Sequence, residues 1–240
     1  MGWLPYSSLI YCFGSAVMAS LSGPVTLRLA WDLLFVLNPM SHKKRTCHRH
    51  RAQLNGEVSH SSADATGLGG HCCARHGCFA PGSMVDFQKG EKQMNMDWSF
   101  CEALSTTNIG ELLRILHIYD ITCQYCVHLK ERIERNPHLS IPDQLQLLHA
   151  IGLFHVHGHK DECLYRWATS YVPGAGCIDG EVLETLWAVL NTVSASTRTA
   201  SLAHRTEILD DHMGDSNFKK MINIGEQQPI KLPEYHLFYM

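Results

Sequence analysis

Charge is scarce in this chain of 240 residues, and neither sign prevails. Charged side chains make up 18% of the sequence, below the roughly 25% of an average soluble domain, which excludes long disordered charged tails. Twenty Lys and Arg stand against 23 Asp and Glu, so the formal net charge is −3. The chain is therefore not a polycation, and any contact with nucleic acid must come from local basic patches.

Long apolar runs are also lacking. Residues 1–40 contain only Arg28 and Asp32 as charged side chains, but their apolar run Leu9–Leu21 is broken by glycine and serine and has no basic residue before it. A secretory leader needs such a basic residue, and a membrane span needs about 18 consecutive apolar residues. We interpret residues 1–40 as a buried segment or as sequence not native to the fold, rather than as a leader.

Histidine and cysteine, in contrast, are abundant, with 16 and 10 residues. Imidazole and thiolate are the side chains that bind borderline and soft metals. The cysteines are spread along the chain and several adjoin histidines, which is typical of intracellular zinc sites rather than of a secreted disulfide framework. We expect reduced thiols and at least one metal site.

An abrupt change at residue 41, where SHKKRTCHRHR begins, indicates a boundary. We divide the chain into an atypical apolar segment (1–40), a Cys/His-rich insert (41–82), a core (83–224) and a tail (225–240). Within the core, apolar periodicity predicts helices over 95–116, 125–135, 181–191, 202–213 and 216–224. Period-two alternation predicts a strand that ends near Asp120, and a second strand begins near Leu147 and leads into a helix.

The first candidate site is Cys47-x2-His50 together with Cys73-x2-His76. Two ligands at this spacing can reach one tetrahedral ion, so the two pairs would complete a structural zinc site. A loop this poor in apolar residues needs another source of folding energy, which favours zinc. The alternative is a histidine-rich loop near a few buried thiols. Further candidate ligands lie nearby: His48, His71, Cys72 and Cys78.

The second candidate site pairs Asp120, at the end of the predicted strand, with Glu181, in the first turn of a predicted helix. Two carboxylates brought together in this way can share divalent ions that assist phosphoryl transfer. The alternatives are a turn residue at the strand end and an acid favoured by the helix dipole.

Three weaker patterns have plain structural interpretations. The alternating His155, His157 and His159 favour a hydrogen-bonding cluster over a metal site. Cys123-x2-Cys126 resembles a zinc or redox pair, but packing of two core thiols is favoured because no thioredoxin-like context accompanies it. Five basic side chains after Glu181 could contact a nucleic-acid backbone or form a solvated face: Arg198, His204, Arg205, Lys219 and Lys220.

Read together, five segments resemble the Kyakuja-Dileera-Zisupton (KDZ) transposases, a fungal group whose members often carry CxC-type cysteine clusters. The segments are CARHGCFAPGSMVDFQKGEKQMNMDW, YDITCQY, GLFHVHGHKDEC, GAGCIDGEVLETLWAVLN and STRTASLAHRTEILDDHMGDSNFKK. Their order is unbroken from about Cys47 to Ile224. Agreement over several long segments is far more specific than any single motif.

The resemblance implies an RNase H-like α/β fold, a mixed sheet with flanking helices, that uses three acids and Mg²⁺ or Mn²⁺ to cut and join DNA. The second family acid falls on Asp120 and the last on Glu181. The family's Cys/His insert falls on Cys47, His50, Cys73 and His76, in agreement with structural Zn²⁺. The implied partner is DNA and the implied location is the nucleus, with no membrane association; homo-oligomer formation is left open.

One family feature is missing. The first acid, in a segment like D-x-N-F, should precede the insert, and residues 1–46 hold no such string. The chain therefore looks like a C-terminal portion of a transposase, incomplete at the N-terminus. We expect a transposase-derived protein without activity. The alternatives are a non-catalytic, zinc-stabilised module that binds DNA or protein, and a thiol oxidoreductase using Cys123 and Cys126.

Overall fold

A small parallel sheet organises the molecule, which we describe from a computed structural model covering residues 12–13, 47, 65–88, 90–107, 109, 114–175 and 177–224. Its strands are β1 (Cys12–Phe13), β4 (Arg114–Ile118) and β5 (Gln146–Ala150), in the order β1-β4-β5. Both pairings are parallel, and β4 meets β5 in the register Arg114↔Gln146. Parallel neighbours cannot be joined by a tight turn, so helices fill the connections.

Alternation along β4 separates two faces of the sheet. Ile115 and Tyr119 pack into the largest core cluster, whereas Leu116 and Ile118 pack on the other side against Ala150 and Ala175. All four apolar residues are nearly fully buried. This confirms the period-two interpretation of the segment and explains its apolar content, because a strand covered on both faces has no solvent side.

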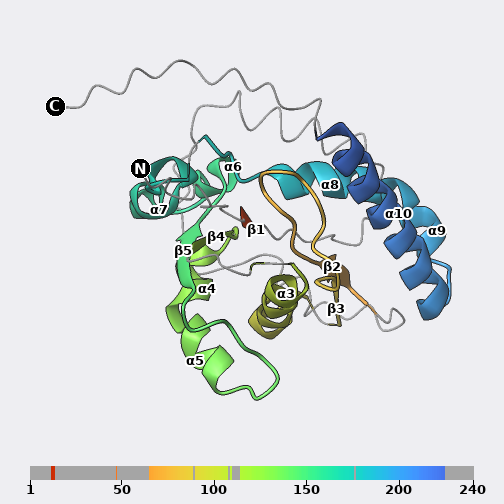
Figure 1. The fold of residues 1–240 in the computed structure, drawn as a ribbon, viewed down its shortest axis with the longest axis horizontal. Helices are drawn as coiled ribbons and strands as arrows, with labels where there is room; N and C mark the ends of the chain where they lie inside the picture. The colour runs from red at the N-terminus through yellow and green to blue at the C-terminus, as the bar shows by residue number, and fades with distance from the viewer. Residues whose placement is uncertain are drawn as a thin grey trace, which may run out of the picture.

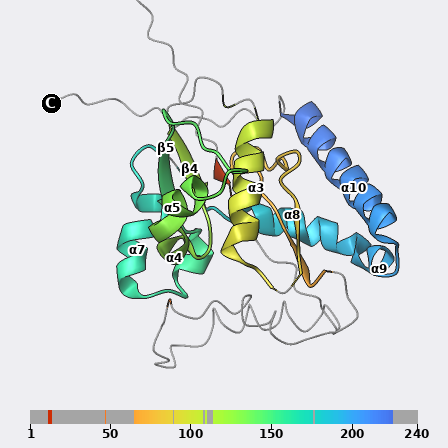
Figure 2. The ribbon, with the colours of Figure 1, turned by 90° about the horizontal axis from the view of Figure 1, so that it is seen from below.

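The face with Ile115 is covered by α3 (Gln93–Thr106), α4 (Thr122–Tyr125) and α5 (Leu129–Glu134). In Figure 2, α7 (Asp161–Trp167) lies beside α4 and away from α3. Between α3 and α5 lies an ion pair in which Arg132 Nε and Nη2 donate to the carboxylate of Asp97 at 2.7 and 2.9 Å. Asp97 is buried, so this bidentate contact satisfies a charge inside the core.

Buried histidines share this interior. His117 of β4 lies against the ring of Phe100, with centroids 4.4 Å apart. Its Nε2 is 3.4 Å from Nε2 of His71, whose Nδ1 lies 2.6 Å from Ser99 Oγ. Both imidazoles are essentially inaccessible to solvent.

A second core lies beside the hairpin of β2 (Gly67–Gly69) and β3 (Val85–Phe87). Leu68, Phe79 and Trp187 join the apolar faces of α8 (Val182–Leu190) and α10 (Leu202–Asn223). Figure 1 shows α10 lying beside α8 and α9 (Ser194–Thr197), far from α7. The remaining elements are α6 (Leu153–Val156), η1 (Cys126–His128), η2 (Thr169–Tyr171) and η3 (Asn191–Val193).

The structure confirms a mixed α/β class and corrects several boundaries. The helix predicted over 95–116 ends at Thr106, because the segment that follows reaches β4. The two helices predicted at 202–213 and 216–224 are one, α10, which continues through Gly214; Gly214 meets no neighbouring atom there, so its missing side chain leaves no gap in the packing.

Candidate functional site

Asp120 lies where the sheet gives way to loops. It follows β4 by two residues, and the intervening Tyr119 N–H still donates to Ala150 of β5 at 3.0 Å. The neighbouring strand β5 continues through Gly152 into α6, which carries His155. The carboxyl ends of two adjacent parallel strands, β4 and β5 in Figure 1, therefore deliver an acid and a histidine to one edge of the sheet.

The imidazole of His155 joins the two acids predicted from sequence. Its Nε2 lies 3.4 Å from Oδ2 of Asp120, and its Nδ1 lies 2.9 Å from Oε2 of Glu181. Glu184 Oε1 is 4.0 Å from the same Nε2. We call these residues, Asp120, His155, Glu181 and Glu184, the acid cluster. The structure thus brings Asp120 and Glu181 to the two sides of one ring rather than into direct contact.

Close backbone packing holds Glu181 in place. Its N–H donates to Asp179 Oδ1 at 3.0 Å, and Gly180 before it has a φ of +81°, which favours glycine. Its Oε1 accepts the backbone N–H of Phe154 at 2.9 Å. A Cβ on Gly152 would lie 2.2 Å from that Oε1, so only glycine allows the carboxylate to reach α6.

Burial and the neighbouring acids together set the electrostatics of the cluster. Burial raises the pKa of Asp120 to about 7, with Glu91, Glu184 and Glu181 adding to the effect of burial and His155 opposing it. Burial alone would lower the pKa of His155, but the hydrogen bond with Glu181 and the charges of Asp120, Glu181 and Glu184 raise it to about 9. At neutral pH His155 is therefore an imidazolium that partly neutralises the acids.

Asp120, His155 and Glu184 each offer a ligand atom, and these atoms lie within 4.8 Å of one another. Carboxylate oxygens suit Mg²⁺ and Mn²⁺, and Mn²⁺ also accepts imidazole nitrogen. A cation bound here would take over the charge that His155 now supplies, so metal and proton compete for one position. The donor set fits a divalent ion.

A second group of ligands includes three residues close in sequence to the acid cluster and one, Cys47, far from it. Cys47, Cys123, His159 and Cys163 place their sulfur and nitrogen atoms within 4.8 Å of one another. We call these four residues the thiol cluster. Cys47 Sγ is 3.5 Å from Cys163 Sγ, and Cys123 Sγ is 3.5 Å from His159 Nδ1. Such a set could hold a structural metal ion, and its chemistry is consistent with zinc.

The zinc ligands predicted from sequence are distributed differently. Cys47 joins the thiol cluster, whereas Cys73 Sγ lies 3.4 Å from Nδ1 of its own partner His76. His50 lies outside the described residues, so the four-ligand set as predicted is not tested. The structure instead gives Cys47 neighbours from α4 and α7.

Three of the predicted basic residues face acids. Arg205 Nη2 lies 2.8 Å from Asp86 Oδ1, Lys219 pairs with Asp215, and His204 Nδ1 is 3.5 Å from Glu207. This favours the solvated-face interpretation over contact with a DNA backbone.

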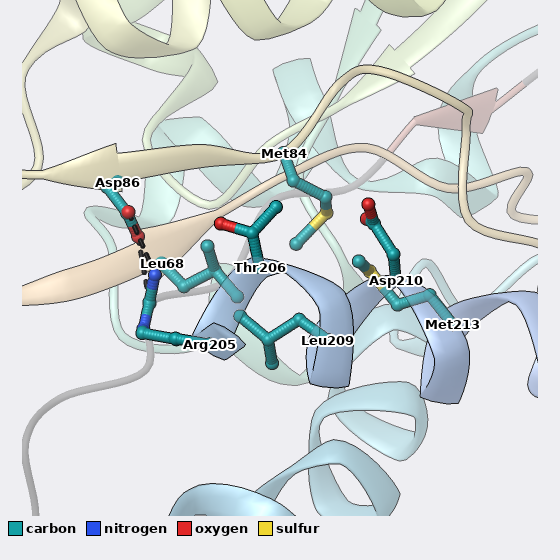
Figure 3. Close-up of a pocket in the computed structure, with 8 residues that line it drawn as sticks. All are labelled: Leu68, Met84, Asp86, Arg205, Thr206, Leu209, Asp210 and Met213. Atoms are coloured by element: carbon teal, nitrogen blue, oxygen red, sulfur yellow. Dashed lines mark hydrogen bonds and ion pairs between the residues drawn. The ribbon is translucent and has the colours of Figure 1, made fainter. Parts of the chain in front are cut away.

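The Arg205 pair also closes one end of a cavity of about 100 Å³ between α10 and the β2–β3 hairpin, lined by Met84, Leu209 and Met213 (Figure 3). Small-molecule pockets measure about 300 Å³ or more, so this gap suits no organic substrate.

With this geometry in place, comparison with protein families is decisive. The family model of the Kyakuja-Dileera-Zisupton transposases matches residues 17–217. The chain belongs to the KDZ transposase family. In this KDZ chain the match begins inside the charge-poor segment 1–40 and includes both clusters. Searches of curated proteins and of solved structures returned no match. Across the part of the chain that the structure describes, no helix has the length and apolar character needed to cross a bilayer.

Sequence reasoning missed two candidate features of this KDZ protein. Glu184 was not singled out, although its i,i+3 spacing from Glu181 on α8 is a signal that could have found it. The thiol cluster was missed because its ligands come from segments as distant as Cys47 and Cys163, and Cys123 was assigned to core packing. Nothing in local spacing distinguishes Cys123, which joins the cluster, from Cys126, which does not.

Proposed function

We propose that the acid cluster derives from the DNA-cleaving and strand-transfer site of a transposase that uses Mg²⁺ or Mn²⁺. The observation that carries this proposal is the single imidazole of His155 between Asp120 and Glu181. These two acids are the ones that the resemblance assigns to the reaction. Family membership supports DNA as the partner and the nucleus as the location.

An RNase H-like fold is part of the same proposal. Parallel strands in the order β1-β4-β5, with α3, α4 and α5 covering one face, support it. The acids lie at the carboxyl edge of these strands, where open α/β sheets place their sites.

Within the site, Asp120, Glu184 and deprotonated His155 would hold the divalent ion, with Glu181 beside them. A bound ion would polarise the phosphate and favour attack by an oxygen nucleophile. The chain's own residues have simpler tasks. Phe154 N–H and His155 Nδ1 fix the two oxygens of Glu181, and His155 holds a proton at neutral pH until the ion replaces it.

We further propose that turnover is absent because the first acid is missing. The strand beside β4 is β1, whose two residues are Cys12 and Phe13. Neither is an acid, and no D-x-N-F-like segment precedes Cys47. A metal site short of one bridging carboxylate binds its ions weakly and loses most of its rate.

The test uses the full chain and Mn²⁺ as a probe. Mn²⁺ should bind, as measured by electron paramagnetic resonance, and Asp120→Asn and Glu181→Gln should each weaken binding roughly tenfold or more. Asp211→Asn, an exposed acid on α10, is the matched control and should leave the affinity unchanged. Equal affinities in all variants would reject the metal site, and Mn²⁺-dependent nicking of plasmid DNA would reject the loss of turnover.

A second candidate function is a non-catalytic DNA- or protein-binding module. The imidazolium of His155 already compensates the acids without a metal, which is how a purely structural network would be arranged. In this case the chain would bind no Mn²⁺, and Asp120→Asn would lower stability without changing DNA retention in a gel-shift assay.

A further inference from the structure

The thiol cluster has the geometry of a metal site rather than of chance packing. Three sulfurs and one imidazole nitrogen converge from three separate parts of the chain. The backbone N–H of Lys160 points at Cys47 Sγ at 3.4 Å, the kind of donor that stabilises a metal-bound thiolate. Cys163 is buried and the other three ligands are half-buried.

An apolar shell shields this cluster. Cys47, Cys123 and Cys163 pack with Ile151, Val156 and Ala168, and with partly buried Leu153, Leu164 and Trp167. A hydrophobic shell of this kind is a usual component of structural metal sites.

We propose that Cys47, Cys123, His159 and Cys163 bind one zinc ion tetrahedrally, and that this ion positions the acid cluster. The set of three sulfurs and one nitrogen is a common composition for closed structural zinc sites. It differs from the set predicted from spacing, because Cys47 is combined with core residues instead of with Cys73 and His76. Zinc binding is independent of the proposed function, whereas the positioning role rests on it.

Short covalent links connect the two clusters. Cys123 follows Asp120 by three residues through the start of α4, and His159 follows His155 by four residues through the end of α6. His159 also interacts with the backbone of Asp120. An ion bound by Cys123 and His159 would therefore fix the spacing of Asp120 and His155, which are the two sides of the 3.4 Å contact in the acid cluster.

The first experiment measures metal content of the full chain purified under reducing conditions with Zn²⁺, and the spectrum after Co²⁺ substitution. Cys123→Ser and Cys163→Ser should each lose one equivalent of zinc and the charge-transfer band of thiolate-bound Co²⁺. Cys126→Ser is the matched control, since it alters the same Cys-x2-Cys motif outside the cluster, and it should retain both signals. Unchanged zinc in Cys123→Ser, or equal loss in Cys126→Ser, would overturn the site.

A conservative variant keeps the test informative if the serine variants do not fold. His159→Cys should retain zinc, and its Co²⁺ charge-transfer band should intensify because a fourth thiolate replaces the imidazole. An unchanged Co²⁺ spectrum in His159→Cys would remove His159 from the site. Loss of the Cys47 and Cys163 thiols to a disulfide, without metal, would overturn the proposal as well.

The second experiment separates positioning from the proposed function. Relative to wild type, Cys123→Ser should weaken Mn²⁺ binding at the acid cluster by about 10-fold to 100-fold, whereas Cys126→Ser should not. If wild type binds zinc but no Mn²⁺, the proposed function fails and the zinc site stands. If Cys123→Ser loses zinc but binds Mn²⁺ as wild type does, the positioning role is wrong.

Discussion

His117 lies inside the sheet and His155 lies just beyond its carboxyl edge, and the two are held in opposite charge states. His117, inside β4, has a pKa well below the ordinary value because of burial, with His71 and His149 adding to the effect. His155, beyond β5, has its pKa raised to about 9 because acids outweigh burial. The sheet therefore has a neutral interior and a charged carboxyl end, separated along β4 by the step from His117 to Asp120.

This difference shows that residue type alone does not assign a histidine its role. Aromatic rings surround His117, so only its neutral form is compatible with the fold. Carboxylates surround His155, so its charged form is the stable one. Stability and chemistry are thus separated along the strand: the interior excludes unpaired charge, and the carboxyl end collects charge and candidate metal ligands. Each prediction below tests one side of that separation.

Lowering the pH should have the largest effect on folding stability, and it tests the neutral interior. Burial lowers the pKa of His71 to about 3 and that of His149 to about 4, and holds that of His117 well below 6.5. The unfolded chain protonates these imidazoles below pH 6.5, while the folded chain does not, so stability is present above pH 6.5 and lost as pH falls below it. At about pH 5 the loss is roughly 2 kcal/mol for each histidine, measured by urea unfolding.

His117→Phe is the variant that isolates this cause. A phenyl ring suits the contacts with Phe100 and Tyr125 and cannot take up a proton. Its unfolding free energy should fall less steeply than that of wild type between pH 6.5 and 5. The slope of unfolding free energy against pH should correspond to one fewer proton taken up on unfolding. Zinc is present in both samples. Identical slopes would mean that His117 is already solvated in the folded state.

Removing the metal should test how the carboxyl end of the sheet is stabilised. In small zinc modules much of the metal-binding free energy is folding free energy, so stripping zinc from the thiol cluster should lower stability on the order of 5 kcal/mol. Thermal unfolding of wild type with and without a chelator gives this difference. Cys126→Ser should show the same drop, and Cys123→Ser should show none because it starts without the ion. If the chelator does not change the stability of wild type, zinc does not stabilise the carboxyl end of the sheet, and the two regions do not differ in this way.

Arg132→Met probes a charge that the interior does tolerate. The side chain of Asp97 is only 3% exposed, and its carboxylate depends on the bidentate guanidinium. Removing the arginine leaves a buried charge unpaired, which costs about 3–5 kcal/mol. Lys219→Met, which breaks the exposed pair with Asp215, should cost less than about 0.5 kcal/mol. Equal effects in the two variants, by urea unfolding, would show that the Asp97 carboxylate is hydrated.

The sequence anticipated the sheet better than the ligand sets. Ile115, Leu116 and Ile118 form a clear apolar run because β4 is buried on both faces, whereas the stripe of Leu183 and Trp187 marks the one buried face of α8. The end of α3 was placed too late, since Ile109 continued the helical spacing and Gly110 was not taken as a helix stop. Local patterns reflect burial, and they carry little information about where a buried element stops.

The candidate sites also contain some features that local sequence patterns predict and others that depend on tertiary contacts. Asp120 and Glu181 were accessible from sequence because each ends or begins a regular element. Their joining by His155 depends on the close approach of Gly152 to Glu181, which is a tertiary contact. Cys47 reaches Cys163 across 116 residues of chain, and no spacing rule connects them. Pairs within one turn are predictable, whereas ligands gathered by the fold are not.

Glu91 offers the subtlest test, because it lies between the two regions. Tyr119, the residue before Asp120, donates its hydroxyl hydrogen to the Glu91 carboxylate. Burial raises the pKa of Glu91 to about 7, and the hydrogen bond from Tyr119 only partly opposes it. The folded state therefore favours protonated Glu91, and the contribution of Glu91 to stability should fall as pH rises from about 4.5 to about 7, against the opposite trend from the buried histidines.

Glu91→Gln removes this ionisation while keeping an acceptor for Tyr119. Relative to wild type it should gain about 2 kcal/mol of unfolding free energy between about pH 5.5 and about pH 8, because only wild type must bury a charge at the higher pH. Urea unfolding at both pH values measures the gain, and Glu102→Gln on α3 is the control for loss of one carboxylate. If the gain is absent, water reaches Glu91, and the neutral interior ends before Tyr119 rather than at Asp120.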